Sequence, residues 1–170
     1  MMHLILEISL PMALYFMIFA REGVIFLAGS AFAGAVLPMR VIMPTLVLIG
    51  MTNVIGIQML VPLGREKAVL RSVVAGAVVD VVLNIILIPQ FSALGAAIGT
   101  LVAEMTVLMV QLLAIRSIPV RIFSETTIWK LVVAMALATA ASIWSLFVIE
   151  GVLISLLVSA VCFFGTYGVS

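Results

Sequence analysis

Charged residues are what this sequence has least of. Only 9% of the 170 residues are charged, eight of them basic and seven acidic, whereas 66% are apolar. A water-soluble domain carries roughly 25% charged residues, because its surface must be hydrated. The few charges here cannot cover a soluble globule of this length, so we expect lipid to surround most of the chain. A soluble enzyme, a disulfide-rich secreted scaffold and a disordered tail are therefore excluded.

Cysteine, histidine and net charge are scarce as well. Cys162 is the single cysteine and His3 the single histidine, so neither an intrachain disulfide nor a Cys/His metal site is expected. A net charge of +1 offers no basic surface to nucleic acid, which we do not expect as a partner. The sequence contains no H-E-x-x-H, P-loop or G-x-S-x-G motif. We therefore predict no enzymatic activity, no catalytic residues and no cofactor.

Long apolar runs are what the sequence has instead. A membrane-spanning helix needs about 20 mostly apolar residues, whereas barrel strands span about 10 residues and alternate in polarity. The runs here are long and do not alternate, so the predicted fold is all-α, a polytopic bundle in one membrane domain over residues 1–170. Pro89 is expected to end the third helix. The six predicted helices span approximately residues 4–27, 36–63, 68–88, 94–115, 129–149 and 152–170.

Two of the connections have a distinct composition. Residues 28–34 are small and predict a loop between the first two helices. Residues 117–127 mix apolar side chains with proline, arginine and glutamate. This second segment fits either a cytoplasmic stretch that lies on the lipid headgroups or an ordinary loop, and composition does not separate the two.

The basic residues predict an orientation in the membrane. Two junctions, between the second and third helices and between the fourth and fifth, carry most of them. These residues are Arg65, Lys67, Arg71, Arg116, Arg121 and Lys130. Because two helices separate the junctions, both lie on one side, which the positive-inside rule makes cytoplasmic. Both chain ends are then cytoplasmic, and Arg21 and Arg40, beside an outer connection, are the exceptions.

A series of short motifs follows in a fixed order along the chain. These are residues 28–35 with Leu37-Pro38-Met39-Arg40, residues 53–60, residues 63–67, Asn84 to Pro89, and residues 94–100 followed by Glu104. The series resembles the C-terminal half of Wzx-type O-antigen flippases and other flippases of lipid-linked oligosaccharides, within the multidrug/oligosaccharidyl-lipid/polysaccharide exporter superfamily. The resemblance covers residues 10–116. Asp80 and Ser92 depart from the family pattern, which more often has an amide and a glycine there.

The resemblance implies a fold and a function. Flippases of this kind have two lobes of helices with the substrate path between them, so six helices would form one lobe. The implied function is transport of an undecaprenyl-linked glycan across the inner membrane by alternating access. The implied partners are the lipid bilayer, the glycan, and either a missing N-terminal lobe or a second copy. We accordingly interpret the sequence as part of a transporter, either a fragment or a split gene product.

Two acidic residues fall deep inside predicted helices. Asp80 lies midway between Arg71 and Pro89, and Glu104 lies mid-helix in the next span. A carboxylate at the bilayer centre costs at least about 2.5–3.5 kcal/mol on insertion scales, and such residues usually face a bundle interior or a wet cavity. Asn84 follows Asp80 by one helical turn and shares its face. We predict that these residues line a cavity or couple an ion, the alternative being hydrogen-bonded packing.

Two further sets of residues are candidates for defined roles. Gly95 and Gly99 form a G-x-x-x-G pair, which predicts close packing between helices. Arg65, Lys67 and Arg71 are candidate contacts for the pyrophosphate of the substrate at the cytoplasmic face, although we favour their role in orientation under the positive-inside rule. Two other functions stay open, namely a drug/cation antiporter of the same superfamily and a membrane scaffold subunit without a substrate.

Overall fold

The structure is a computed structural model, and it describes residues 2–116. The predicted helices 129–149 and 152–170 and the predicted interfacial segment 117–127 lie outside the described residues. Within that part of the chain every regular element is helical. The structure therefore bears on the first four of the six predicted helices.

The first predicted helix is broken in two. Helices α1 (Met2–Ile18) and α2 (Ala20–Ala28) meet at Phe19, and the axes of Ile8–Ile18 and Ala20–Ala28 differ by 70°. Phe19 has a ψ of 18°, outside the helical range, and its buried ring stacks on Tyr15 with the centroids 4.7 Å apart. Burial of this aromatic ring accompanies the bend. The prediction of one continuous helix over residues 4–27 is therefore wrong.

The second span begins earlier than the sequence predicts. The 3₁₀-helix η1 (Ser30–Ala35) continues into α3 (Val36–Ile42), α4 (Pro44–Asn53) and the π-helix η2 (Val54–Leu60). The chain enters η1 through Gly29, whose φ of 86° favours glycine. Most of the connection predicted over residues 28–34 is thus helical, because its small residues form a 3₁₀ turn that leads into α3. The helical stretch runs over Ser30–Leu60 rather than 36–63.

Helices α5 (Glu66–Phe91) and α6 (Ala93–Ile115) form an antiparallel hairpin. The sequence predicted them over 68–88 and 94–115, so α6 differs by one residue at its start. Pro89 does not end α5, which continues for two more residues to Phe91. The amide of Ser92 still donates to the carbonyl of Ile88 at 2.8 Å. Ser92 alone joins the two helices.

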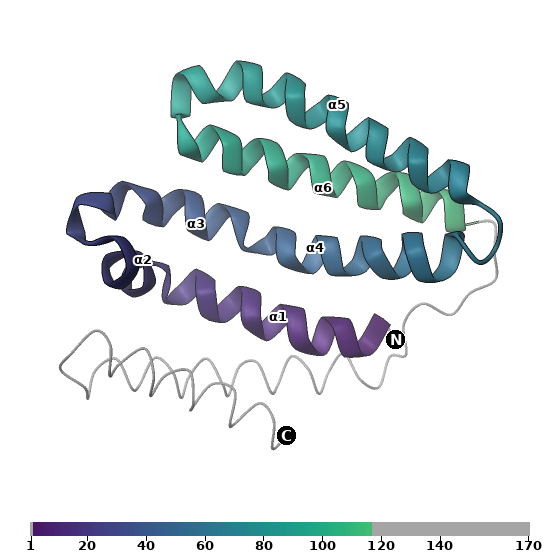
Figure 1. Cartoon of the computed structure of the whole chain (residues 1–170), viewed down its shortest axis with the longest axis horizontal. Coiled ribbons are helices and arrows are strands. Elements are labelled where there is room, and N and C mark those ends of the chain that lie inside the picture. Colours follow the sequence, from purple (N-terminus) through teal and green to yellow (C-terminus); the bar gives the residue numbers. More distant parts are fainter. Residues whose placement is uncertain (1, 117–170) are drawn as a thin grey trace.

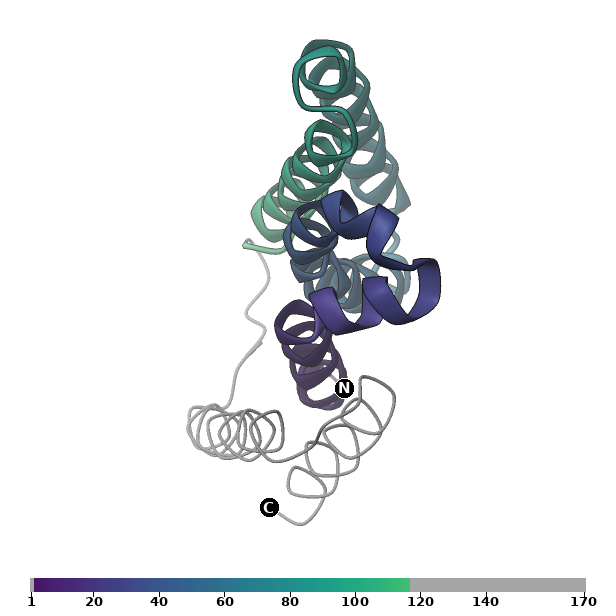
Figure 2. The same ribbon diagram turned by 90° about the vertical axis from the view of Figure 1, so that its left-hand side faces the viewer.

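The long helices lie side by side in a row (Figures 1 and 2). α6 contacts α5 on one side and α3 and α4 on the other, and α1 packs against α4. Successive spans run in opposite directions along the sequence, so the start of α1, the start of α5 and the end of α6 share one end of the bundle (Figure 1). Within the row, α6 runs parallel to its neighbours α3 and α4 (Figure 1). Gly29 and Ser92 lie at the opposite end. Four of the described basic residues, Arg65, Lys67, Arg71 and Arg116, belong to the segments at the first end.

The core is small and the apolar surface is large. A buried cluster of Val54, Ile55, Leu60 and Ile115 joins η2 to the end of α6. By contrast α5 exposes most of its large apolar side chains, with Ile85 69% exposed. Three described helical stretches are long and apolar enough to cross a membrane, or four if α1 and α2 count as one bent span. Exposed apolar surface of this extent fits contact with lipid.

Candidate functional site

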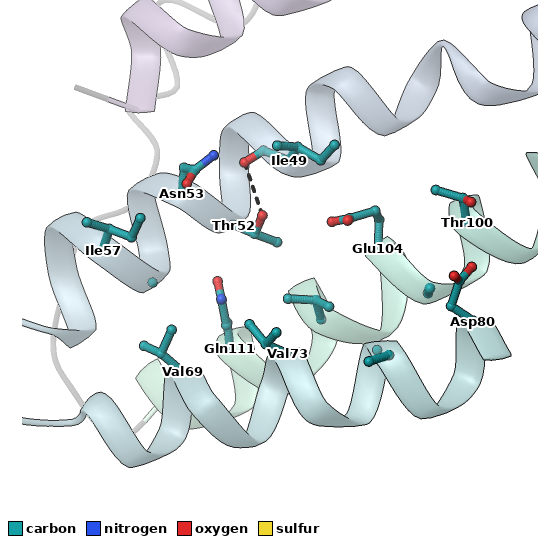
Figure 3. A pocket seen from close by; sticks show the side chains of 15 residues that line it. Ile49, Thr52, Asn53, Ile57, Val69, Val73, Asp80, Thr100, Glu104 and Gln111 are labelled. Atoms are coloured by element: carbon teal, nitrogen blue, oxygen red, sulfur yellow. Dashed lines mark hydrogen bonds between the residues drawn. The ribbon is translucent and has the colours of Figure 1, made fainter.

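A groove with a volume of about 430 Å³ lies between three elements of the row (Figure 3). Its floor is one face of α6, and its walls are α5 on one side and α4 with η2 on the other. The lining combines apolar side chains with carboxyl, amide and hydroxyl groups. The lining residues are Ile49, Thr52, Asn53, Gly56, Ile57, Val69, Val73, Gly76, Ala77, Asp80, Thr100, Ala103, Glu104, Val107 and Gln111.

The residues that form the floor are spaced along α6 so that they share one face of the helix. Thr100, Glu104 and Gln111 recur along α6 at the spacing that places side chains on one face. Ala103 and Val107 fill the same stripe between them. Three of the four polar side chains of this membrane-length helix thus face the groove, and Thr106 is the exception.

The α5 wall comes unusually close to α6 at a glycine. A side chain at Gly76 would collide with Val107 and would stand 3.2 Å from the carbonyl oxygen of Ala103. Absence of a side chain at this position therefore lets the two helices approach. Asp80 follows Gly76 by one turn on the same face, which brings its carboxyl group into the groove.

The opposite wall contains the π-helix. Two hydrogen bonds span five residues, from the amide of Val61 to the carbonyl of Gly56 and from the amide of Arg65 to the carbonyl of Leu60. A π-helix widens the turn, and such segments occur frequently at functional sites. Here the widened turn sets Gly56 directly against Gln111, where a side chain would stand 2.9 Å from the amide nitrogen.

Gln111 forms the centre of a buried polar cluster. Its side chain is 2% exposed, and its Nε2 donates to the hydroxyl of Ser72 at 3.2 Å. Ser72 in turn donates to the carbonyl of Val69 at 2.6 Å. The other amide atom, Oε1, is buried and has no hydrogen-bond partner within the described part of the chain. Figure 3 shows this side chain directed from α6 toward the α4 wall.

The two intramembrane carboxyl groups meet in the groove. Asp80 comes from α5 and Glu104 from α6, and they are close enough to interact electrostatically. Glu104 extends toward the α4 wall, and Asp80 lies farther from η2 along the groove (Figure 3). Oδ1 of Asp80 is buried without a hydrogen-bond partner among residues 2–116. The structure therefore brings together the two acids that the sequence singled out.

Asn84 does not line the groove. It lies at the contact between α5 and α6, where a side chain at Gly99 would stand 2.7 Å from its Oδ1. A side chain at Gly95 would collide with the backbone of Leu87. The structure thus places Gly95, Gly99 and Asn84 together in the helix interface, one turn along α5 from Asp80.

The basic residues predicted to contact phosphate lie outside the groove. Nη1 of Arg65 donates to the carbonyl oxygen of Ala114 at 2.7 Å, which ties the start of α5 to the end of α6. Lys67 and Arg71 are exposed on α5. No lysine, arginine or histidine lines the groove as the described residues define it.

Several residues at or beside the groove were not predicted as site residues from the sequence. Thr52, whose hydroxyl donates to the carbonyl of Ile49 at 3.0 Å, and Asn53 both line the α4 wall. Ser72 and Gly56 become relevant only through Gln111 on another helix. Asn53 and Gly56 do fall within the motif series, whereas nothing in the order of residues marks Ser72. No group of three or more His, Cys, Asp or Glu comes together in the described region.

Fold and groove together define an all-helical protein with membrane-length apolar helices around a polar site. Such helices indicate a protein embedded in a membrane. Comparisons with protein-family models, with curated proteins and with solved structures find no match to this chain.

Proposed function

We propose that this chain is a membrane transport protein that carries a lipid-linked oligosaccharide across the inner membrane, as one lobe of a flippase that works by alternating access. The observation that carries the proposal is the groove itself. Carboxyl, amide and hydroxyl groups from α4, α5 and α6 gather there, inside helices that are otherwise apolar. Polar groups at such depth are costly and mark substrate or ion pathways.

A lipid-linked sugar suits a groove of this composition. Its sugar hydroxyls lose hydrogen bonds to water on entering the membrane, and polar side chains can replace those bonds. Its lipid tail needs no such partner and can stay against exposed apolar side chains such as Ile57 and Val73 at the groove. Lys67 and Arg71, exposed near the η2 end of α5, are available to the phosphate groups. Movement requires no covalent chemistry.

Reconstitution tests this function. The full chain is placed in liposomes that hold undecaprenyl pyrophosphate linked to a fluorescent oligosaccharide. A quencher that does not cross the membrane then reports how fast the inner-leaflet label reaches the outer leaflet. We expect faster exchange than in protein-free liposomes. Exchange at the protein-free rate would contradict the proposal and leave the scaffold function.

A pair of neighbouring positions on α5 supplies matched variants. Ala77 lines the groove, whereas Val78 is exposed and does not line it. Ala77→Phe fills part of the groove with a ring and should abolish most of the exchange. Val78→Phe adds a ring of the same size on the outer face and should leave the exchange near its original rate. Equal effects of the two variants would show that the groove is not the path.

The proximity of Asp80 and Glu104 favours one other function, a cation-coupled drug antiporter. Paired carboxyl groups inside membrane helices are a common arrangement for proton or cation coupling. An imposed proton or sodium gradient across the same liposomes separates the functions. Gradient-driven uptake of a cationic dye without exchange of the lipid-linked sugar would establish the antiporter.

A further inference from the structure

Hydrogen-bond acceptors dominate the polar lining of the groove. The carboxyl oxygens of Asp80 and Glu104 and the buried Oε1 of Gln111 face it from α5 and α6. Two donors of the same lining are already engaged, because the hydroxyl of Thr52 bonds to Ile49 and Nε2 of Gln111 bonds to Ser72. The amide of Asn53 and the hydroxyl of Thr100 are the other donors of the lining, so carboxyl and amide oxygens outnumber the donors that a ligand meets there.

Gln111 adds one more hydrogen-bond acceptor to those of Asp80 and Glu104. Its side chain lines the groove as theirs do. The side chain is 2% exposed, yet its Oε1 has no partner among the described residues. A buried amide oxygen left unpaired costs about 1–3 kcal/mol. An O–H or N–H group of a ligand in the groove would remove that cost, whereas a carboxylate or phosphate oxygen would add a second acceptor beside it.

The charges at the groove lead to the same conclusion. The described lining contains two acidic residues and no basic one. An anionic group in this place would have no cationic partner and would lie close to two carboxyl groups, which is unfavourable at low dielectric. The exposed basic residues Lys67 and Arg71 lie nearer the start of α5.

From these observations we infer that the groove selects its cargo by charge and admits neutral or amine-bearing sugars but not sugars that carry a carboxylate. This inference rests on the proposed function and specifies its substrate class. The pyrophosphate of the same molecule then lies outside the groove, toward Lys67 and Arg71. Each sugar hydroxyl or ammonium group donates to an acceptor of Asp80, Glu104 or Gln111.

A panel of three substrates tests the inference on the unmodified chain. The three are disaccharides on undecaprenyl pyrophosphate, labelled on the outer sugar, whose inner sugar is glucose, glucosamine with a free amine, or glucuronic acid. Exchange between leaflets is measured in the same liposomes for each. We expect the glucuronic acid substrate to cross at least about tenfold more slowly than the other two, because like charges meet at the groove.

The rates of the three substrates distinguish failure of this inference from failure of the proposed flippase function. Equal rates for all three substrates, or fastest exchange of glucuronic acid, would overturn the inference while leaving the flippase function in place. Exchange of none of them would overturn the function, and the inference with it.

Variants of the lining provide a second measurement. The double variant Asp80→Asn/Glu104→Gln removes both acids, and should narrow the difference between the glucuronic acid and glucose substrates. Gln111→Leu removes the unpaired acceptor and should slow the glucose substrate about fivefold. Thr106→Val is the matched control on α6, because Thr106 donates to Val102 and does not line the groove. An unchanged preference in the double variant would also contradict the inference.

Discussion

Ser92 has a backbone conformation that is unusual for a residue other than glycine. It forms the whole connection between α5 and α6, and it does so with φ 49° and ψ −125°. This conformation is accessible to glycine, whereas a residue with a Cβ atom is strained there. The hairpin therefore tolerates a strained serine at its tip.

Ser92→Gly should stabilise the protein. Relief of the strain exceeds the added entropy of glycine in the unfolded chain, and we expect a net gain of about 1 kcal/mol. The measurement is the unfolding temperature in detergent micelles. Ser92→Ala keeps the Cβ atom and should give no gain, so an equal rise in both variants would rule out relief of backbone strain.

At the same scale, the two acids of the groove could be identified from the sequence, whereas the buried pair of Gln111 and Ser72 could not. Asp80 and Glu104 were conspicuous because charge is rare in membrane helices. Gln111 and Ser72 are ordinary polar residues in sequence, and their importance arises only where α5 and α6 meet. The position of Asn84 opposite Gly99 likewise could not be predicted, because its spacing from Asp80 carries no information about the neighbouring helix.

The hairpin of α5 and α6 depends on two glycines that differ in their surroundings. A Cβ atom at Gly95 would collide with the backbone of Leu87, which cannot move aside. A Cβ atom at Gly99 would meet the side-chain oxygen of Asn84 at 2.7 Å, and a side chain can rotate away. Gly95 is therefore the less replaceable of the pair.

We expect Gly95→Ala to destabilise the protein by about 2–3 kcal/mol and Gly99→Ala by less than about 1 kcal/mol. Unfolding in increasing denaturing detergent measures both. Gly34→Ala is the control, since no atom lies within 4 Å of a side chain added there. A larger loss at Gly99 than at Gly95 would be incompatible with this account of the packing.

The ends of a helix could be predicted where the neighbouring residues in the sequence determine them. The limits of α6 agree with the sequence to within one residue at its start, because an apolar run of the right length leaves few alternatives. The bend at Phe19 was missed, since neither proline nor glycine marks it and it accompanies burial of the aromatic ring. The end of α5 was predicted too early at Pro89, because the helix continues past this proline to Phe91 before it turns at Ser92.

The molecule as a whole has two ends with different composition. Arg65, Lys67 and Arg71 begin α5 at one end, and Ser92 closes the hairpin at the other (Figure 1). If α5 crosses the bilayer, these ends face opposite compartments. The positive-inside rule places the basic end in the cytoplasm.

Labelling with a membrane-impermeant thiol reagent tests this orientation. Cys162, the single native cysteine, is first replaced by serine. In intact cells we expect Ser92→Cys to react from outside and Lys67→Cys to react only after the membrane is opened. Reaction of both from outside would show that α5 does not cross the membrane, and reaction of Lys67→Cys alone would invert the orientation.

The central claim is that the polar groove between α4, α5 and α6 holds the sugar of a lipid-linked substrate. Its most direct test is photolabelling of the unmodified chain in liposomes with undecaprenyl pyrophosphate linked to a sugar that bears a diazirine. Mass spectrometry then locates the adducts. We predict adducts on groove residues such as Ala77 and Thr100, lost in competition with unlabelled substrate. Adducts concentrated on the outer face of α5, at Ile85 and Ile86, would contradict the claim.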